Sequence, residues 1–218
     1  MRTPLTSVIG YTDLLLRKDP PAEIRQQWLL NIRDNGQKIA DLVDDLLNVT
    51  RIQSGKYNLK MSEIKLADVV NDRLPIIQDS TNRHVFKVNI DADLPTVLAD
   101  KDKLGQILNN LLSNAVKYSP NGGTINIKAH FEITENKIVV AIADQGMGIS
   151  NNDKSTLFKT FHRIQRPETR GIRGSGLGLY IVKEWVEAMD GKIWLDSQLN
   201  QGSTFYFSLP CVNKGIEA

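Results

Sequence analysis

One apolar stretch in the middle of the chain ends in a carboxylate and two glycines. Residues 137–143 are almost wholly apolar, which predicts a strand covered on both faces or nearly so. Asp144 follows directly and would be half-buried. Such a carboxylate needs a hydrogen-bond donor: the exocyclic amine of adenine is one candidate, and a turn that Asp144 caps is an equal alternative. Gly146 and Gly148 would let a flat base approach the backbone.

The segment 102–118 predicts a strongly amphipathic helix with a polar face beside its apolar stripe. Asn110, Asn114 and Lys117 stand at i, i+4 and i+7 and therefore share that face. Asparagine can give Mg²⁺ a neutral oxygen ligand, and the lysine can give phosphates a positive charge. The alternative is an ordinary polar helix face.

A second glycine-rich turn, residues 174–178, opens directly into a helix predicted over 179–189. Its backbone N–H groups and the helix dipole would favour an anion such as a phosphate. The spacing matches neither the Rossmann fingerprint nor a Walker loop. The turn alone is weak evidence.

Between the two glycine turns lies a polar stretch rich in arginine. A mobile lid that closes over polyphosphate fits this pattern, and a solvated surface loop fits it equally well. The residues concerned are Phe158, Phe161, Arg163, Arg166, Arg170 and Arg173.

The N-terminal quarter predicts a helical hairpin. Apolar residues recur at steps of three and four over 5–16 and again from Pro21 to Gly55, with a proline pair between the two runs. A single hairpin of this size leaves an apolar stripe uncovered, so we expect it to pair with a second copy into a four-helix bundle. Packing of the hairpin on its own C-terminal domain is the alternative.

The remaining pattern mixes strands and helices without a strict alternation. It predicts a helix over 66–80, strands over 85–90 and 124–130, and a closing hairpin of strands over 193–196 and 204–209. We expect an α+β sandwich in which helices cover one face of a mixed sheet.

Composition excludes several classes of protein. The formal net charge of +2 over 218 residues gives no electrostatic reason for binding nucleic acid or an acidic membrane surface. The single cysteine, Cys211, cannot form an internal disulfide, which favours a reducing, cytoplasmic setting. No apolar run approaches the about 18 residues of a membrane span, so we expect no membrane contact by this chain, although it could be the cytoplasmic part of a membrane-bound sensor.

Four motifs, in order, resemble those of the sensor histidine kinases of two-component signalling, within the GHKL superfamily of gyrase, chaperone, kinase and mismatch-repair ATPases. Residues 110–118 resemble the N box, 144–148 the first glycine box, 157–163 the F box and 174–179 the second glycine box. The resemblance implies a GHKL-type (Bergerat) ATP-binding domain over 56–218, after a dimerisation and phosphotransfer hairpin over 1–55.

The resemblance also implies residue roles. Asn114 would hold Mg²⁺, Asn110 and Lys117 would lie near the phosphates, Tyr118 against the adenine, Asp144 on its amine and Arg163 toward the γ-phosphate. Further nucleotide contacts would come from Gly146, Met147, Gly148, Ile149, Phe158, Phe161, Gly174, Ser175, Gly176, Leu177, Gly178, Leu179 and Thr204.

Residues 1–5 resemble the end of the family's H box. The phospho-accepting histidine and its neighbouring acid would then lie just before Met1, so we expect a fragment that binds ATP without labelling itself. His84, His130 and His162 lie outside the hairpin and are interpreted as surface or strand-edge histidines. Thr3 matches the threonine with which some members dephosphorylate their partner.

The implied activity is transfer of the γ-phosphate of ATP to a histidine and onward to an aspartate of a response-regulator receiver domain, by a homodimer. Two other classes stay open. One is another ATPase of the superfamily, such as an anti-sigma serine kinase or a topoisomerase-like hydrolase, although hydrolases usually carry Glu in place of Asn110. The other is a non-catalytic dimeric scaffold with a degenerate pocket.

Overall fold

The computed structural model describes residues 2–55, 57–164, 169, 172 and 174–212. The chain divides into two compact units, residues 1–56 and 57–218. None of the helices in the described ranges combines the length and the apolarity that a membrane span requires.

The first unit is a helical hairpin, as predicted. Helix α1 spans Arg2–Arg17 and α2 spans Ala22–Gln53. The two helices pack against each other, with Tyr11 and Trp28 in contact at a ring-centroid distance of 6.4 Å. Several large apolar side chains of the hairpin stay exposed, so it has apolar surface to offer a partner. They are Leu5, Ile9, Leu16, Ile24, Leu29, Val43, Leu46 and Leu47.

The second unit contains a five-stranded mixed sheet in the order β2-β4-β5-β7-β6. Strands β2 and β4 are parallel, and every other neighbouring pair is antiparallel. The strands are β2 (His84–Ile90), β4 (Gly123–Glu132), β5 (Lys137–Asp144), β6 (Lys192–Ser197) and β7 (Ser203–Pro210). A separate antiparallel pair joins β1 (Met61–Ile64) to β3 (Val97–Asp100).

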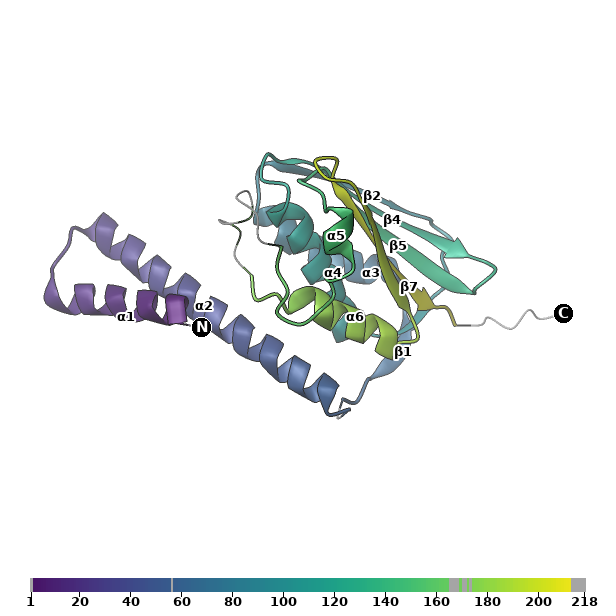
Figure 1. Cartoon of the computed structure of the whole chain (residues 1–218), viewed down its shortest axis with the longest axis horizontal. Coiled ribbons are helices and arrows are strands. Elements are labelled where there is room, and N and C mark those ends of the chain that lie inside the picture. The colour runs from purple at the N-terminus through teal and green to yellow at the C-terminus, as the bar shows by residue number, and fades with distance from the viewer. Residues whose placement is uncertain (1, 56, 165–168, 170–171, 173, 213–218) are drawn as a thin grey trace. The chain divides into compact units, whose positions relative to one another are not determined.

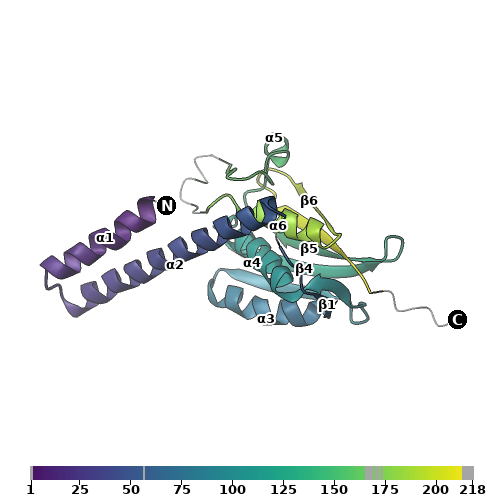
Figure 2. The same ribbon diagram turned by 90° about the horizontal axis from the view of Figure 1, so that it is seen from below.

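Three helices cover one face of this sheet, as Figures 1 and 2 show. They are α3 (Leu66–Asp79), α4 (Lys101–Lys117) and α6 (Gly178–Ala188). Helix α4 lies between the other two and packs on β5. A short helix, α5 (Asn151–Lys154), follows the first glycine turn. The predicted sandwich of helices on one face of a mixed sheet is confirmed.

The apolar stripe of α4 forms the centre of the core. Its leucines and isoleucines are fully buried, together with Trp185 of α6 and Phe207 of β7. The helix begins at residue 101 because Asp100 caps it, accepting hydrogen bonds from the backbone N–H groups of Asp102 and Lys103. The second oxygen of Asp100 accepts from the N–H of Lys60 at 2.8 Å.

Strand β5 is covered on one face and only partly on the other. Ile138, Val140 and Ile142 are buried against the helices, whereas the residues between them are half-exposed. The second face, where Trp194 and Tyr206 stack at 5.4 Å, is thus nearly but not fully covered, which is the second of the two cases expected from the sequence. An apolar run does not by itself distinguish the two cases, because small apolar residues tolerate partial exposure.

The core position of α4 gives a stability prediction. Ile107 is 0% exposed, so Ile107→Ala should lower the free energy of unfolding by about 2–5 kcal/mol through lost burial and the cavity left behind. The matched control is Ile76→Ala on α3, where the side chain is 60% exposed and the cost should stay below about 1 kcal/mol. Urea denaturation followed by circular dichroism measures both; equal costs would contradict this account of the core.

Candidate functional site

Asp144 is the last residue of β5 and is 9% exposed. Its Oδ1 accepts hydrogen bonds from the backbone N–H of Gly146 at 2.8 Å, from that of Ser203 at 3.3 Å and from Ser119 Oγ at 3.5 Å. Burial raises the pKa of this carboxyl, and the three donors offset only part of the rise. Every hydrogen bond from the described residues goes to Oδ1, which leaves Oδ2 for a donor on a ligand.

The first glycine turn is packed tightly between two backbone segments. A Cβ at Gly146 would lie 2.1 Å from the Tyr118 carbonyl oxygen, and one at Gly148 would lie 2.0 Å from the carbonyl oxygen of Gln198. Gly148 also has a φ of +63°, which disfavours any other residue. Contacts within the protein therefore require glycine at both positions, a reason that differs from the room for a base expected from the sequence.

Neighbouring residues of this turn hold it in place through the backbone. The N–H of Met147 donates to the Tyr118 carbonyl at 3.0 Å, and its carbonyl accepts from Asn200 N–H at 2.7 Å. The N–H of Ile149 donates to Ser197 Oγ at 2.8 Å. Thr204 pairs with Ala143 across β5 and β7, one register position from Asp144.

Helix α4 carries the predicted amides on one face. Asn110 donates from Nδ2 to the carbonyl of Gln106 at 3.1 Å. Asn114 makes no side-chain hydrogen bond to any described residue, so its amide is available to a ligand. Lys117, at the last turn, is exposed. Tyr118 caps the helix and is half-buried, and this burial raises its pKa.

The second glycine turn meets this amide face. Gly178 begins α6, and a Cβ there would lie 2.4 Å from Asn110 Oδ1. The turn before it is shaped by Gly176, with a φ of +73°, and by Ser175 Oγ, which accepts from the N–H of Leu177 at 3.2 Å. Leu179 follows in the first turn of α6, and Gly174 has open space around it. The fold thus joins two motifs that lie far apart in the sequence.

The F-box residues are described only in part. Phe158 is half-buried, and Phe161 is 64% exposed with a φ of +57°. Arg163 is exposed and donates from its guanidinium to the Ile172 carbonyl. Its charge acts on the Tyr118 phenol, where it counters part of the effect of burial on the pKa. Arg166, Arg170 and Arg173 lie outside the described residues.

Two members of the site were missed by the sequence analysis. Ser119 is 2% exposed and donates to Asp144, a contact between elements that no local pattern could reveal. Gln106 stands at i−4 from Asn110 and so shares the amide face; its Oε1 is buried with no partner among the described residues. The helical spacing that selected Asn110 and Asn114 could have found it. Thr3 lies in the first unit, where its carbonyl accepts from Ser7 Oγ at 3.1 Å.

Comparison with known families agrees with this arrangement. Residues 99–213 match the model of the histidine kinase-, DNA gyrase B- and HSP90-like ATPases. Residues 1–55 match that of the His Kinase A (phospho-acceptor) domain. The chain belongs to the sensor histidine kinases. The phospho-acceptor model matches the helical hairpin, and the ATPase model matches the α+β domain that follows it.

Individual relatives extend the likeness to nearly the whole chain. Sensor histidine kinase WalK of Bacillus subtilis is 33% identical over 96% of this sensor kinase chain and 35% of its own length. The crystal structure of full-length ShkA with AMPPNP covers 97% of this chain and 44% of ShkA, at 26% identity and a TM-score of 0.74. The match to a crystal structure of histidine kinase ThkA in complex with response regulator TrrA covers 97% of this chain and 58% of that chain. At 22% identity and a TM-score of 0.70, it shows a likeness of fold.

The chain is shorter than the family members that it resembles. It spans 26%, 35% and 56% of the lengths of three similar curated relatives, which therefore contain segments beyond the matched part.

The burial of Asp144 predicts how stability responds to pH. Because its pKa is raised in the fold, the contribution of this carboxyl to stability is complete below its ordinary pKa of roughly 3.9 and is lost as the pH rises through the raised value. Asp144→Asn keeps an oxygen for all three donors and removes the charge. At pH 7 and without ligand we expect the variant to be more stable than the parent.

Thermal unfolding across pH measures this difference. The advantage of the Asn variant should shrink as the pH falls toward the ordinary pKa of the carboxyl. Asp196→Asn, at an exposed position of β6, serves as the control and should show no such advantage. A variant less stable than the parent at pH 7 would show that the charge is stabilising in the ligand-free fold.

Proposed function

We propose that this chain is the ATP-binding catalytic core of a sensor histidine kinase, transferring the γ-phosphate of ATP to a histidine and onward to a response-regulator aspartate. The observation that carries the proposal is a buried carboxylate, Asp144, with one oxygen committed to the protein and the other uncommitted. The likeness to named sensor kinases supports the same activity.

Adenine recognition rests on Oδ2 of Asp144. The exocyclic amine of adenine can donate to it, whereas guanine presents a carbonyl at that position and would be repelled. A charge-assisted hydrogen bond of this kind contributes roughly 1.5–3 kcal/mol, or about one to two orders of magnitude in affinity. Tyr118, half-buried at the end of α4, would pack against the base.

The triphosphate would lie along the amide face of α4 and the second glycine turn. Asn110 and Lys117, both on α4, would contact it, and the N-terminus of α6 would add backbone N–H groups. Mg²⁺ fits this site because Asn114 offers an amide oxygen that no described residue engages, with the remaining ligands supplied by phosphate oxygens and water. The ion neutralises phosphate charge when bound.

Phosphoryl transfer then depends mainly on position and charge. Lys117 and Arg163 would stabilise the negative charge of the transferring group while the adenine end is anchored at Asp144. Residues 1–56 contain no histidine, so none of these hairpin residues is the acceptor in this proposal. The exposed apolar side chains of the hairpin would form the dimer. The partner in onward transfer would be a response-regulator receiver domain; ThkA, which shares this fold, has been solved in complex with the response regulator TrrA. Thr3 is proposed to assist dephosphorylation of that partner.

Nucleotide affinity tests the proposal directly. Asp144→Asn should weaken binding of a non-hydrolysable ATP analogue by about tenfold to a hundredfold, because the amine loses a charged acceptor. Isothermal calorimetry in excess Mg²⁺ gives the constants, with Asp196→Asn as the matched control. Unchanged affinity in Asp144→Asn would remove this residue from the adenine pocket.

The proposed Mg²⁺ ligand gives a separate prediction. Asn114→Ala should raise the Mg²⁺ concentration needed for half-maximal ATP-analogue binding by about tenfold, while affinity measured without Mg²⁺ changes little. Asn89→Ala, at an exposed position of β2, is the control. If both variants titrate like the parent, Asn114 does not hold the ion.

Transfer itself is measured in a form of the chain extended at its N-terminus by an H-box segment that carries an acceptor histidine. Incubation with γ-labelled ATP should give acid-labile label, and Asn110→Ala in the same form should abolish most of it. Steady hydrolysis of ATP with no labelled histidine would favour another ATPase of the superfamily.

A further inference from the structure

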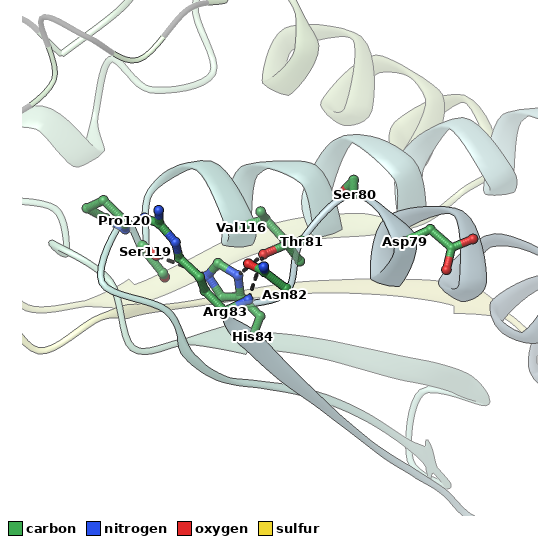
Figure 3. A pocket seen from close by; sticks show the side chains of 9 residues that line it. All are labelled: Asp79, Ser80, Thr81, Asn82, Arg83, His84, Val116, Ser119 and Pro120. Carbon is green, nitrogen blue, oxygen red and sulfur yellow. Dashed lines mark hydrogen bonds between the residues drawn. The ribbon is translucent and has the colours of Figure 1, made fainter.

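A cavity of about 580 Å³ opens between the end of α3, the start of β2 and the C-terminal end of α4. Its lining is residues 79–84 with Val116, Ser119 and Pro120. Figure 3 shows Asp79 at one end, Ser119 and Pro120 at the other, and His84 with Thr81 between them. Among the lining residues, Ser119 is also part of the candidate site, where it contacts Asp144.

The His84 ring is held at both of its nitrogens. Nε2 lies 3.0 Å from the Ser119 carbonyl oxygen, and because a carbonyl only accepts, Nε2 carries the proton. Nδ1 lies 2.8 Å from Thr81 Oγ1. That hydroxyl already accepts from the N–H of Arg83 at 3.3 Å, which leaves its own hydrogen for Nδ1. The ring therefore connects the start of β2 to the segment after α4.

A second contact fixes the same two segments to each other. The N–H of Gly123 donates to the Arg83 carbonyl at 3.2 Å, and a Cβ at Gly122 would lie 2.2 Å from that carbonyl oxygen. Gly122 N–H in turn donates to the Ser119 carbonyl at 2.9 Å. The Ser119 carbonyl thus receives two donors, of which His84 is the one that a side-chain substitution can remove.

Ser119 transmits this position to the adenine end of the site. Its hydroxyl lies 3.5 Å from Asp144 Oδ1, the outer limit of a hydrogen bond, so a small displacement would break the contact. A Cβ at Gly146 would lie 2.7 Å from the same hydroxyl, which shows how closely Ser119 backs the first glycine turn. Asp144 keeps two backbone donors without Ser119, so loss of this contact would leave the carboxylate in place with one constraint fewer on its orientation.

We propose that His84 is a positioning residue for adenine recognition. By holding the Ser119 carbonyl it places the Ser119 hydroxyl on Oδ1 of Asp144, which in turn directs Oδ2 at the adenine amine. This inference rests on the proposed function, because it assigns His84 to the same nucleotide site. It touches no nucleotide atom itself and acts through Ser119, which lines the same cavity.

The test measures a ratio of affinities. Purine riboside triphosphate is ATP without the exocyclic amine, so its binding does not use the proposed contact with Asp144. The ratio of its dissociation constant to that of ATP reports how well Asp144 is oriented. In the parent chain we expect ATP to bind more tightly. In His84→Leu this preference should fall about three- to tenfold, the effect of one orienting hydrogen bond.

Two further variants distinguish a positioning role of His84 from a general loss of structure around the site. His84→Gln can place an amide N–H near the position of Nε2 and should restore most of the preference for ATP. Ser119→Ala removes the transmitting hydroxyl and should lower the preference as His84→Leu does. His130→Leu, at an exposed position of β4, is the matched control and should leave the ratio unchanged.

The outcomes distinguish the two proposals. If the ratio of the two dissociation constants is unchanged in His84→Leu, whether or not both affinities fall, the positioning role is overturned while the proposed function stands. A parent chain that binds both nucleotides equally overturns the adenine contact of Asp144 and the role of His84 with it. Should His84→Leu fail to fold, His84→Asn replaces it, since its shorter amide does not reach the Ser119 carbonyl; retained preference in that variant overturns the proposal.

Discussion

The burial of one carboxylate at the end of β5 determines how the rest of the site is organised. Low solvent access disfavours the charged form of Asp144, and three donors on a single oxygen offset only part of that cost. Those donors come from the first glycine turn, the start of β7 and the segment after α4. A ligand that donates to the second oxygen would complete the set, which links recognition of the base to relief of an electrostatic penalty.

Periodicity predicted the elements that carry the site because each is long and has one clear apolar face. Helix α4 is the best example, since seven buried positions fall on one stripe and the amides fall beside it. Strands β1 and β3 were not predicted, because four residues give too short an alternation and their stability comes from pairing with each other. The recognised motifs supplied the family, and the family models agree with it.

Contacts between distant elements could not be predicted from the sequence. The need for glycine at residues 146 and 148 arises from carbonyl groups of other segments, not from the turn itself. His84 was interpreted as a strand-edge histidine, and it does begin the edge strand β2, but its bond to Ser119 joins residues 35 positions apart. Such bonds depend on the tertiary fold, so no local pattern encodes them.

The order of strands in the sheet has a consequence for biosynthesis. Strand β7 follows the other four strands of its sheet in the sequence, yet it lies between β5 and β6 and supplies the Ser203 donor to Asp144. A nascent polypeptide that has not yet reached this strand leaves β5 with an open edge and the carboxylate short of a partner. The sheet of this domain therefore closes only after β7 has been made, and a product that ends before β7 exposes the edge of β5.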